Sequence, residues 1–191
     1  MQIDRIIYPV ETLGPGKRFS IWTVGCSKRC KSCANPELWC ADPAKDISVD
    51  VIIEYCVKVA CASRVDGITI TGGDPIEQTE DFFALIENLK MISNDILVYT
   101  GYTLAEIEDM LAPEQIETLK QNVSVLIDGR YIDEKNDGFS ALRGSSNQVI
   151  HYFQPEKQKK YEEYISKGRT VQNFYYSEKI ISVGIHNRPV I

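Results

Sequence analysis

A β-strand pattern followed by a glycine recurs along this chain, and this recurrence limits the possible folds more than any other feature. The four strand patterns cover residues 19–24, 68–71, 96–99 and 123–127, and they precede Gly25, Gly72, Gly101 and Gly129. The last three glycines are 29 residues (72 to 101) and 28 residues (101 to 129) apart, the length of one strand and one helix. Strands that alternate with helices in this way form a parallel sheet.

Helical periodicity occupies the segments between these strands. The predicted helices cover residues 48–62, with Ser48 as N-cap, 80–91, and 104–120 with an interruption at Pro113. The elements predicted after the fourth strand are an irregular loop rich in glycine and serine at 129–146, a strand at 149–153, a charged helix at 155–167 and a strand at 180–185.

The number of predicted strands decides the fold class. Six strands are too few for a closed eight-stranded barrel but suit a partial one. We therefore predict an α/β fold in which residues 1–191 form a single domain: a partial, open TIM-like barrel of about six parallel strands with outer helices. In such folds the chemistry gathers at the C-terminal ends of the strands, where all four glycine turns fall. We expect the functional site at that end.

The composition disfavours several classes of function. A net charge of −6 argues against nucleic acid as an obligatory partner, because phosphate recognition needs a basic surface. No apolar run approaches the ~20 residues that a membrane span requires, so we expect a cytoplasmic protein that does not bind membranes. Six cysteines in a chain long enough to build its own core favour metal binding over disulfides.

Half of the cysteines are clustered. Cys26, Cys30 and Cys33 form a C-x3-C-x2-C motif on a loop directly after the first strand pattern. Three thiolates on a short loop can bind three corners of a cubane iron–sulfur cluster and leave the fourth iron without a protein ligand. Cys40 extends the motif to C-x3-C-x2-C-x6-C, so a structural zinc site is an alternative. A zinc site, however, does not explain the glycine turns that follow.

The remaining reactive side chains have simpler interpretations. Cys56 and Cys61 lie in the helix predicted at 48–62 and are expected to be buried as small hydrophobic residues. His151 and His186, the two histidines, are expected to be packed or on the surface. Basic residues crowd around the clustered cysteines in the sequence, where they either compensate thiolate charge or dock an acidic electron donor: Lys17, Arg18, Lys28, Arg29 and Lys31.

The cysteine spacing resembles the signature of the radical S-adenosylmethionine superfamily. Further segments, in the same order over nearly the whole chain, resemble the small activating enzymes of glycyl-radical proteins. These segments are Gly14-Pro15-Gly16-Lys17-Arg18-Phe19, Asn35-Pro36-Glu37-Leu38-Trp39, Gly72-Gly73-Asp74-Pro75 and Leu142-Arg143-Gly144-Ser145-Ser146-Asn147-Gln148. The resemblance implies a radical S-adenosylmethionine domain with a 4Fe-4S cluster on Cys26, Cys30 and Cys33.

The resemblance also implies where S-adenosylmethionine binds. Its methionyl amino and carboxylate groups would chelate the fourth iron, and Gly72, Gly73 and Asp74 would contact the amino group. The backbone of Ser32 and Ala34, on either side of the last clustered cysteine, would lie along the adenine. No side chain beyond the cluster ligands is implied as catalytic. This sequence departs from common family patterns at three positions: Ser32, Ala34 and His186.

The implied function is that of an activating enzyme. It would cleave S-adenosylmethionine reductively into methionine and a 5′-deoxyadenosyl radical, which makes a glycyl radical on a partner protein. The favoured partner is an anaerobic ribonucleotide reductase, and the favoured electron donor is a flavodoxin or ferredoxin. The alternatives are a radical enzyme that modifies a small molecule or peptide, and a non-enzymatic zinc or iron–sulfur binding protein.

Two further residues are candidates with open alternatives. Asp128 ends the fourth strand pattern, where it either accepts a hydrogen bond from a ribose hydroxyl or the methionyl amine, or is a turn aspartate. Arg143 lies in the late loop, where its guanidinium either binds a carboxylate or backbone of the partner protein, or forms a structural salt bridge.

Overall fold

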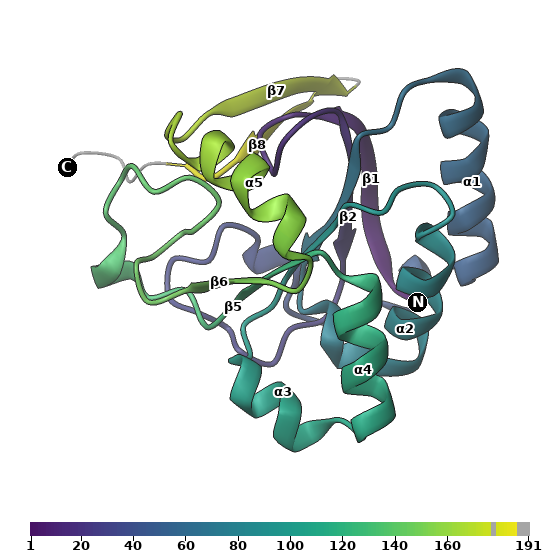
Figure 1. Cartoon of the computed structure of the whole chain (residues 1–191), viewed down its shortest axis with the longest axis horizontal. Coiled ribbons are helices and arrows are strands. Elements are labelled where there is room, and N and C mark those ends of the chain that lie inside the picture. Colours follow the sequence, from purple (N-terminus) through teal and green to yellow (C-terminus); the bar gives the residue numbers. More distant parts are fainter. Residues whose placement is uncertain (177–178, 187–191) are drawn as a thin grey trace.

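A mixed α/β architecture accounts for most of the residues that the computed structural model describes, 1–176 and 179–186 (Figure 1). Its main sheet has six strands, whose spatial order follows the chain order. These strands are β1 (Ile3–Val10), β2 (Arg18–Thr23), β3 (Gly67–Gly72), β4 (Ile96–Tyr99), β5 (Val125–Asp128) and β6 (Val149–Tyr152). The predicted α/β class is confirmed.

The direction of the strands corrects one part of the prediction. Strands β2, β3, β4 and β5 are parallel, but β1 pairs antiparallel with β2, and β6 pairs antiparallel with β5. The prediction of about six parallel strands is therefore wrong at both edges. A parallel pair needs a long crossover, usually a helix, whereas the connections 11–17 and 129–148 contain no α-helix. Closure into a partial barrel stays a prediction.

The α-helices connect the parallel strands as expected. They are α1 (Val49–Ala62), α2 (Thr79–Leu89), α3 (Leu104–Met110), α4 (Pro113–Asn122) and, after β6, α5 (Gln158–Ile165). The side chain of Ser48 accepts a hydrogen bond from Val51 N, so the predicted N-cap of α1 is confirmed. Pro113 begins α4, where its missing N–H is not needed, and this is why the predicted interruption separates α3 from α4.

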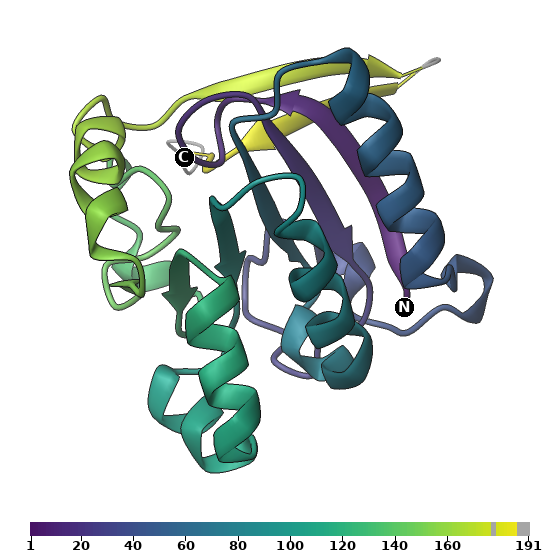
Figure 2. The ribbon, with the colours of Figure 1, turned by 45° about the vertical axis from the view of Figure 1, so that its right-hand side comes forward.

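Side chains alternate between the two faces of the sheet and form separate cores. In β4, Ile96 and Val98 pack with residues of α1, α2 and α4, whereas Leu97 packs with Tyr161 of α5. A second sheet consists of β7 (Val171–Tyr176) paired with β8 (Lys179–Gly184). It packs on β1 and β2, on the face of the main sheet opposite to α1, α2 and α4. Figure 2 shows this hairpin beside β1 and β2, on the side away from α1. The strand predicted at 180–185 therefore exists, but outside the main sheet.

A buried polar network closes the N-terminal end of the parallel strands. Arg18, the first residue of β2, is fully buried, and its guanidinium donates to Thr69 Oγ1 (2.8 Å) and Asp95 Oδ1 (3.2 Å). Tyr161 Oη and Lys160 Nζ also donate to the Asp95 carboxylate, at 2.5 and 2.8 Å. Arg18 thus lies at the opposite end of β2 from the cysteine motif, which corrects the expectation that it serves the clustered thiols.

Candidate active site

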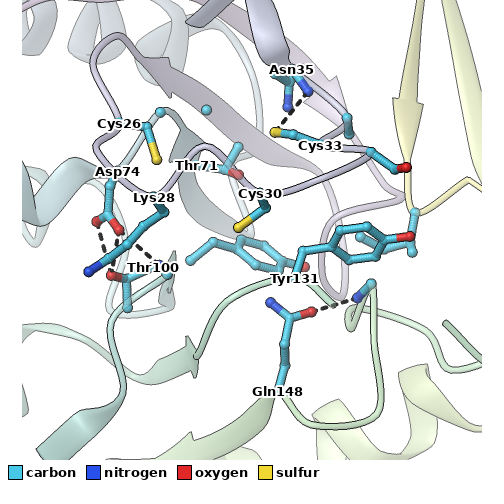
Figure 3. Close-up of a pocket in the computed structure, with 18 of the residues that line it drawn as sticks. Cys26, Lys28, Cys30, Cys33, Asn35, Thr71, Asp74, Thr100, Tyr131 and Gln148 are labelled. Carbon is cyan, nitrogen blue, oxygen red and sulfur yellow. Dashed lines mark hydrogen bonds between the residues drawn. The ribbon is translucent and has the colours of Figure 1, made fainter. Parts of the chain in front are cut away.

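A cavity of about 690 Å³ opens at the C-terminal ends of the parallel strands, where the functional site was expected (Figure 3). Its lining combines the loop after β2, the turns after β3 and β4, the long loop after β5 and the end of β8. It contains most of the residues proposed from the sequence: Cys26, Cys30, Ser32, Cys33, Ala34, Gly72, Gly73 and Asp74. Lys28, Thr100, Tyr131 and Gln148 also contribute, and Figure 3 shows them around the same space.

The cysteine loop is held at its start and bent along its length. Gly25 N and Cys26 N donate to the carbonyl oxygens of Leu38 (2.8 Å) and Trp39 (3.0 Å), which anchor the beginning of the loop. Arg29 and Ser32 have left-handed backbone conformations, with φ of 46° and 58°. These non-glycine residues in a rarely populated region turn the chain sharply between the cysteines. The three thiols consequently line one cavity from a single loop.

The donor set fits an iron–sulfur cluster better than a structural zinc ion. Soft thiolate ligands suit both, but structural zinc needs four ligands, and Cys40 is exposed and outside the cavity lining. The three remaining cysteines match a cluster that keeps one iron open. Within the described residues, no three cysteine, histidine, aspartate or glutamate side chains are grouped closely enough to hold a single metal ion. The cysteines of a cubane cluster do not need to meet at one point, because each binds a different iron.

Burial raises the pKa of the Cys26 thiol, and the nearby carboxylates of Asp74 and Glu77 raise it further, against hydrogen bonds from the backbone of Lys28 and Arg29. A raised pKa favours the thiol over the thiolate. Because a metal ligand must be deprotonated, ligation of Cys26 would release a proton and depend on pH.

The Gly72–Gly73 turn packs directly against the end of β2. Gly73 N donates to Thr23 O at 2.7 Å, and Asp74 N donates to Gly25 O at 2.8 Å. A Cβ on Gly73 would lie 2.3 Å from Gly25 O, and one on Gly72, which has φ of 106°, would lie 2.5 Å from Thr23 N. Both glycines are therefore required by the approach of two backbones, and this approach fixes the start of the cysteine loop beside the turn.

Asp74 is a buried carboxylate with neutral donors. It is 1% exposed, and it accepts hydrogen bonds from Gly101 N (2.8 Å), Thr100 Oγ1 (2.9 Å) and Ile76 N (3.2 Å). Burial raises the pKa of Asp74 to about 6, helped by the charge of Glu77 and opposed by those donors. The group is therefore mostly ionised at neutral pH, although its donors carry no charge. Such a carboxylate favours a cation from the cavity.

Comparison with known proteins agrees with this geometry. The model of a family described as a 4Fe-4S single cluster domain matches residues 12–151, which include the cysteine motif and the Gly72–Asp74 turn. Relatives named anaerobic ribonucleoside-triphosphate reductase-activating protein match over most of their length. The protein from Vibrio cholerae is 32% identical over 155 residues, which are 76% of this chain and 95% of the relative.

Two further relatives carry the same name. The Haemophilus influenzae protein is 32% identical over 153 residues (76% of this chain, 95% of the relative), and the Enterobacteria phage T4 protein is 35% identical over 156 residues (78% and 93%). This chain belongs to the family of anaerobic ribonucleoside-triphosphate reductase-activating proteins. In the part of the chain that the structure describes, none of the helices has the length and apolar character needed to span a membrane.

Asp128 has a different place from the one proposed for it. Its buried carboxylate accepts from Leu104 N at 2.7 Å and Val149 N at 3.2 Å, and it contacts His151 Nε2 at 2.9 Å. It is absent from the cavity lining, although its neighbour Gly129 is present. The geometry therefore supports the alternative of a structural aspartate, which joins the start of α3 to β6. His151 is correspondingly a packed residue, as expected.

Other predicted residues are divided between the cavity and its surroundings. Arg143 lies outside the lining and donates from Nη1 to Gln148 O at 3.3 Å, within its own loop. His186 is exposed at the rim of the cavity. Cys56 is buried on α1 as predicted, and burial raises the pKa of its thiol to about 12. The same prediction is wrong for Cys61, which is exposed.

Arg169, a residue not proposed from the sequence, joins two segments that line the cavity, the loop after β5 and the residues after β8. Its guanidinium donates to Ser140 O (3.0 Å) and Arg143 O (3.1 Å) in the loop after β5, and to His186 O (3.1 Å) after β8. Its side chain is 4% exposed. No motif surrounds this arginine in the sequence, and it lies beyond the residues that the family model matches. Only the folded arrangement of the loop and hairpin identifies it.

Proposed function

We propose that this protein binds a 4Fe-4S cluster through Cys26, Cys30 and Cys33, cleaves S-adenosylmethionine reductively, and generates a glycyl radical on an anaerobic ribonucleoside-triphosphate reductase. One observation carries the proposal. The three cysteines line a cavity that also contains the Gly72–Asp74 turn, and the buried carboxylate of this turn has neutral hydrogen-bond donors. The names of the relatives support the choice of reductase as the partner.

The bound cluster would supply the electron that splits S-adenosylmethionine into methionine and a 5′-deoxyadenosyl radical. The chain would position the reactants. Asp74 would accept a hydrogen bond from the N–H of the methionyl amino group, beside Gly72 and Gly73, and the backbone of Ser32 and Ala34 would lie along the adenine. Asp128 is left out of this site because its carboxylate holds α3 and β6.

The macromolecular partners complete the proposal. A glycine-bearing loop of the reductase would enter the cavity, and Arg143, in the loop beside the entrance, would contact the reductase. The electron would come from a flavodoxin or ferredoxin. We assign residues 1–191 to one radical S-adenosylmethionine domain with the form of an open partial barrel, active in the cytoplasm.

The first experiment tests the chemistry. The protein is reconstituted anaerobically with iron and sulfide, reduced with dithionite and incubated with S-adenosylmethionine, using wild type, Cys30→Ala and Cys61→Ala. Because Cys61 is exposed and outside the cavity, its variant is the matched control. We expect 5′-deoxyadenosine from wild type and Cys61→Ala only. One bound zinc ion and no cleavage by the wild type would refute the proposal.

A second experiment tests the partner. The reconstituted protein and S-adenosylmethionine are mixed with anaerobic ribonucleoside-triphosphate reductase, and the glycyl radical is measured by electron paramagnetic resonance. A doublet on the reductase supports the assigned partner. Production of 5′-deoxyadenosine without that signal would instead favour a radical enzyme that modifies a small molecule or a peptide.

A further inference from the structure

The carboxylate of Glu77 holds the cysteine loop between its first two cysteines. Glu77 belongs to the short 3₁₀-helix η3 (Pro75–Gln78), directly after the Gly72–Asp74 turn. Its two carboxylate oxygens accept from Ser27 N at 2.9 and 3.0 Å, and Oε1 also accepts from Ser27 Oγ at 2.5 Å. The residue directly after Cys26 is thereby bound through both its backbone and its side chain to a different part of the fold.

The next residue of the loop is held by a neighbouring contact. Lys28 Nζ lies 3.0 Å from the centre of the Tyr102 ring, a cation–π arrangement. Tyr102 Oη in turn lies 3.5 Å from Glu77 Oε1. Ser27 and Lys28 are therefore fixed by two side chains that also meet each other.

The same 3₁₀-helix holds the end of β2. Gln78 Nε2 donates to Val24 O at 3.0 Å and to Gln2 O at 3.1 Å. Together with the bonds from Glu77, these contacts fix the chain on both sides of Cys26. The segment from Cys26 to Cys30 forms no strand or helix of its own, so contacts of this kind decide where its thiols stand.

We propose that Glu77 is a positioning residue for the iron–sulfur cluster: by binding Ser27, it holds the loop that carries the cysteine ligands. This inference rests on the proposed assignment of the cluster to Cys26, Cys30 and Cys33. A loop held before the cluster binds loses less conformational entropy on ligation, so the cluster is retained more firmly. Glu77 also places a negative charge beside the ligand loop. A nearby anion makes reduction of a cluster less favourable and so lowers its reduction potential.

Glu77 should therefore have two effects: its hydrogen bonds should slow the loss of iron, and its charge should lower the reduction potential. Different substitutions separate these effects. Glu77→Gln removes the charge and keeps one oxygen that can accept from Ser27, whereas Glu77→Ala removes both. Ser27→Ala keeps the charge and the backbone N–H but deletes the hydroxyl donor. Glu80, exposed in the first turn of α2, supplies the matched controls Glu80→Gln and Glu80→Ala.

The experiment measures three properties of the reconstituted proteins: the rate at which a chelator removes iron, the reduction potential of the cluster, and the electron paramagnetic resonance spectrum of its reduced form. We expect Glu77→Ala to lose iron about ten- to a hundredfold faster than wild type, matching the loss of metal affinity that follows when a group supporting the ligands is removed. Glu77→Gln should retain iron better than Glu77→Ala and raise the reduction potential. Both Glu80 variants should match wild type.

A double-mutant cycle and a stability control complete the design. In Ser27→Ala/Glu77→Ala the effects on iron loss should be less than additive, because both substitutions remove the same hydrogen bond. Thermal unfolding of the cluster-free proteins shows whether the fold is intact. Iron loss and potential in Glu77→Ala equal to those of Glu80→Ala would overturn this inference alone. A wild-type protein that assembles no cluster would overturn the proposed function as well.

Discussion

Two buried aspartates stand at opposite ends of the parallel strands, and they differ in charge environment rather than in burial. Asp95, at the N-terminal end, is 3% exposed, and Asp74, at the C-terminal end, is 1% exposed. Asp95 receives hydrogen bonds from the cations Arg18 and Lys160 as well as from Tyr161. Asp74 receives hydrogen bonds from Gly101 N, Thr100 and Ile76 N, which are neutral.

The pKa values move in opposite directions for this reason. Burial raises the pKa of both carboxyls, but at Asp95 the charges of Arg18 and Lys160 outweigh burial and lower it. At Asp74 burial prevails, and the pKa rises to about 6. A carboxylate whose cations lie within the fold stabilises the fold, whereas one with only neutral donors favours a cation from outside. From this difference we expect Asp95 to contribute to stability and Asp74 to ligand binding in the proposed site.

The largest effect is expected from Arg18→Met. The substitution removes a fully buried cation from Asp95 and leaves its carboxylate buried with fewer partners. Loss of one partner of a buried ion pair costs about 3–5 kcal/mol. Unfolding by guanidinium chloride should show a decrease of this size in the free energy of unfolding. A loss below 1 kcal/mol would mean that the polar network is not what stabilises this end of the sheet.

Asp74→Asn should act on ligand binding more than on stability. A hydrogen bond to a charged group contributes about 1.5–3 kcal/mol, so affinity for S-adenosylmethionine should fall about ten- to a hundredfold. Titration calorimetry on the anaerobic, reconstituted protein measures this change, and chemical unfolding should show a smaller loss than in Arg18→Met. Unchanged affinity would contradict the proposed difference between Asp74 and Asp95, because Asp74 would then be another structural carboxylate.

The pH dependence of the affinity for S-adenosylmethionine also tests the role of Asp74. In the proposed site, S-adenosylmethionine would bind the ionised form of Asp74, whose pKa without ligand is raised to about 6. Affinity for S-adenosylmethionine should therefore be nearly constant above pH 7 and fall as pH decreases below 6, by about tenfold per unit well below the pKa. The dependence should disappear in Asp74→Asn. Binding that weakens equally with pH in both proteins would assign the effect to another group.

Lys160→Met should have the smallest effect. Its side chain is 47% exposed, so its 2.8 Å ion pair with Asp95 is screened by water. The free energy of unfolding should decrease by about 0–1 kcal/mol, well below the loss in Arg18→Met. Equal losses in the two variants would show that burial of the cation is not the property that matters.

Local signals explain what could be predicted from the sequence. The cysteine motif and the Gly72–Asp74 turn are contiguous, and the strands before them are apolar enough to be recognised. The spacing of the glycines placed these turns at the same edge of the sheet, and the cavity brings them together. Cys61 could also have been placed correctly. It lies five residues after Cys56, which is about 140° around an α-helix, on a different face.

Contacts between distant segments account for what could not be predicted. Strand β1 is a half-buried edge strand that carries Asp4 and Arg5, so it shows little hydrophobic pattern. Strand β7 contains Gln172 and Asn173 and, among the described strands, pairs with β8 alone. The partners of Asp128 come from α3 and β6, far from it in the sequence. No local pattern could therefore show whether its carboxylate was free for a ligand.

Arg169 bears on how such a protein can change its partner over evolution. Several of its acceptors are backbone carbonyls, those of Ser140, Gly144 and His186 among them. A carbonyl is present whatever the side chain, so mutations in the loop can alter its outer surface without releasing its backbone. Phe139, 71% exposed beside Ser140, occupies such a position. The rim of the entrance can thus diverge to suit a new protein while the cavity beneath keeps its shape.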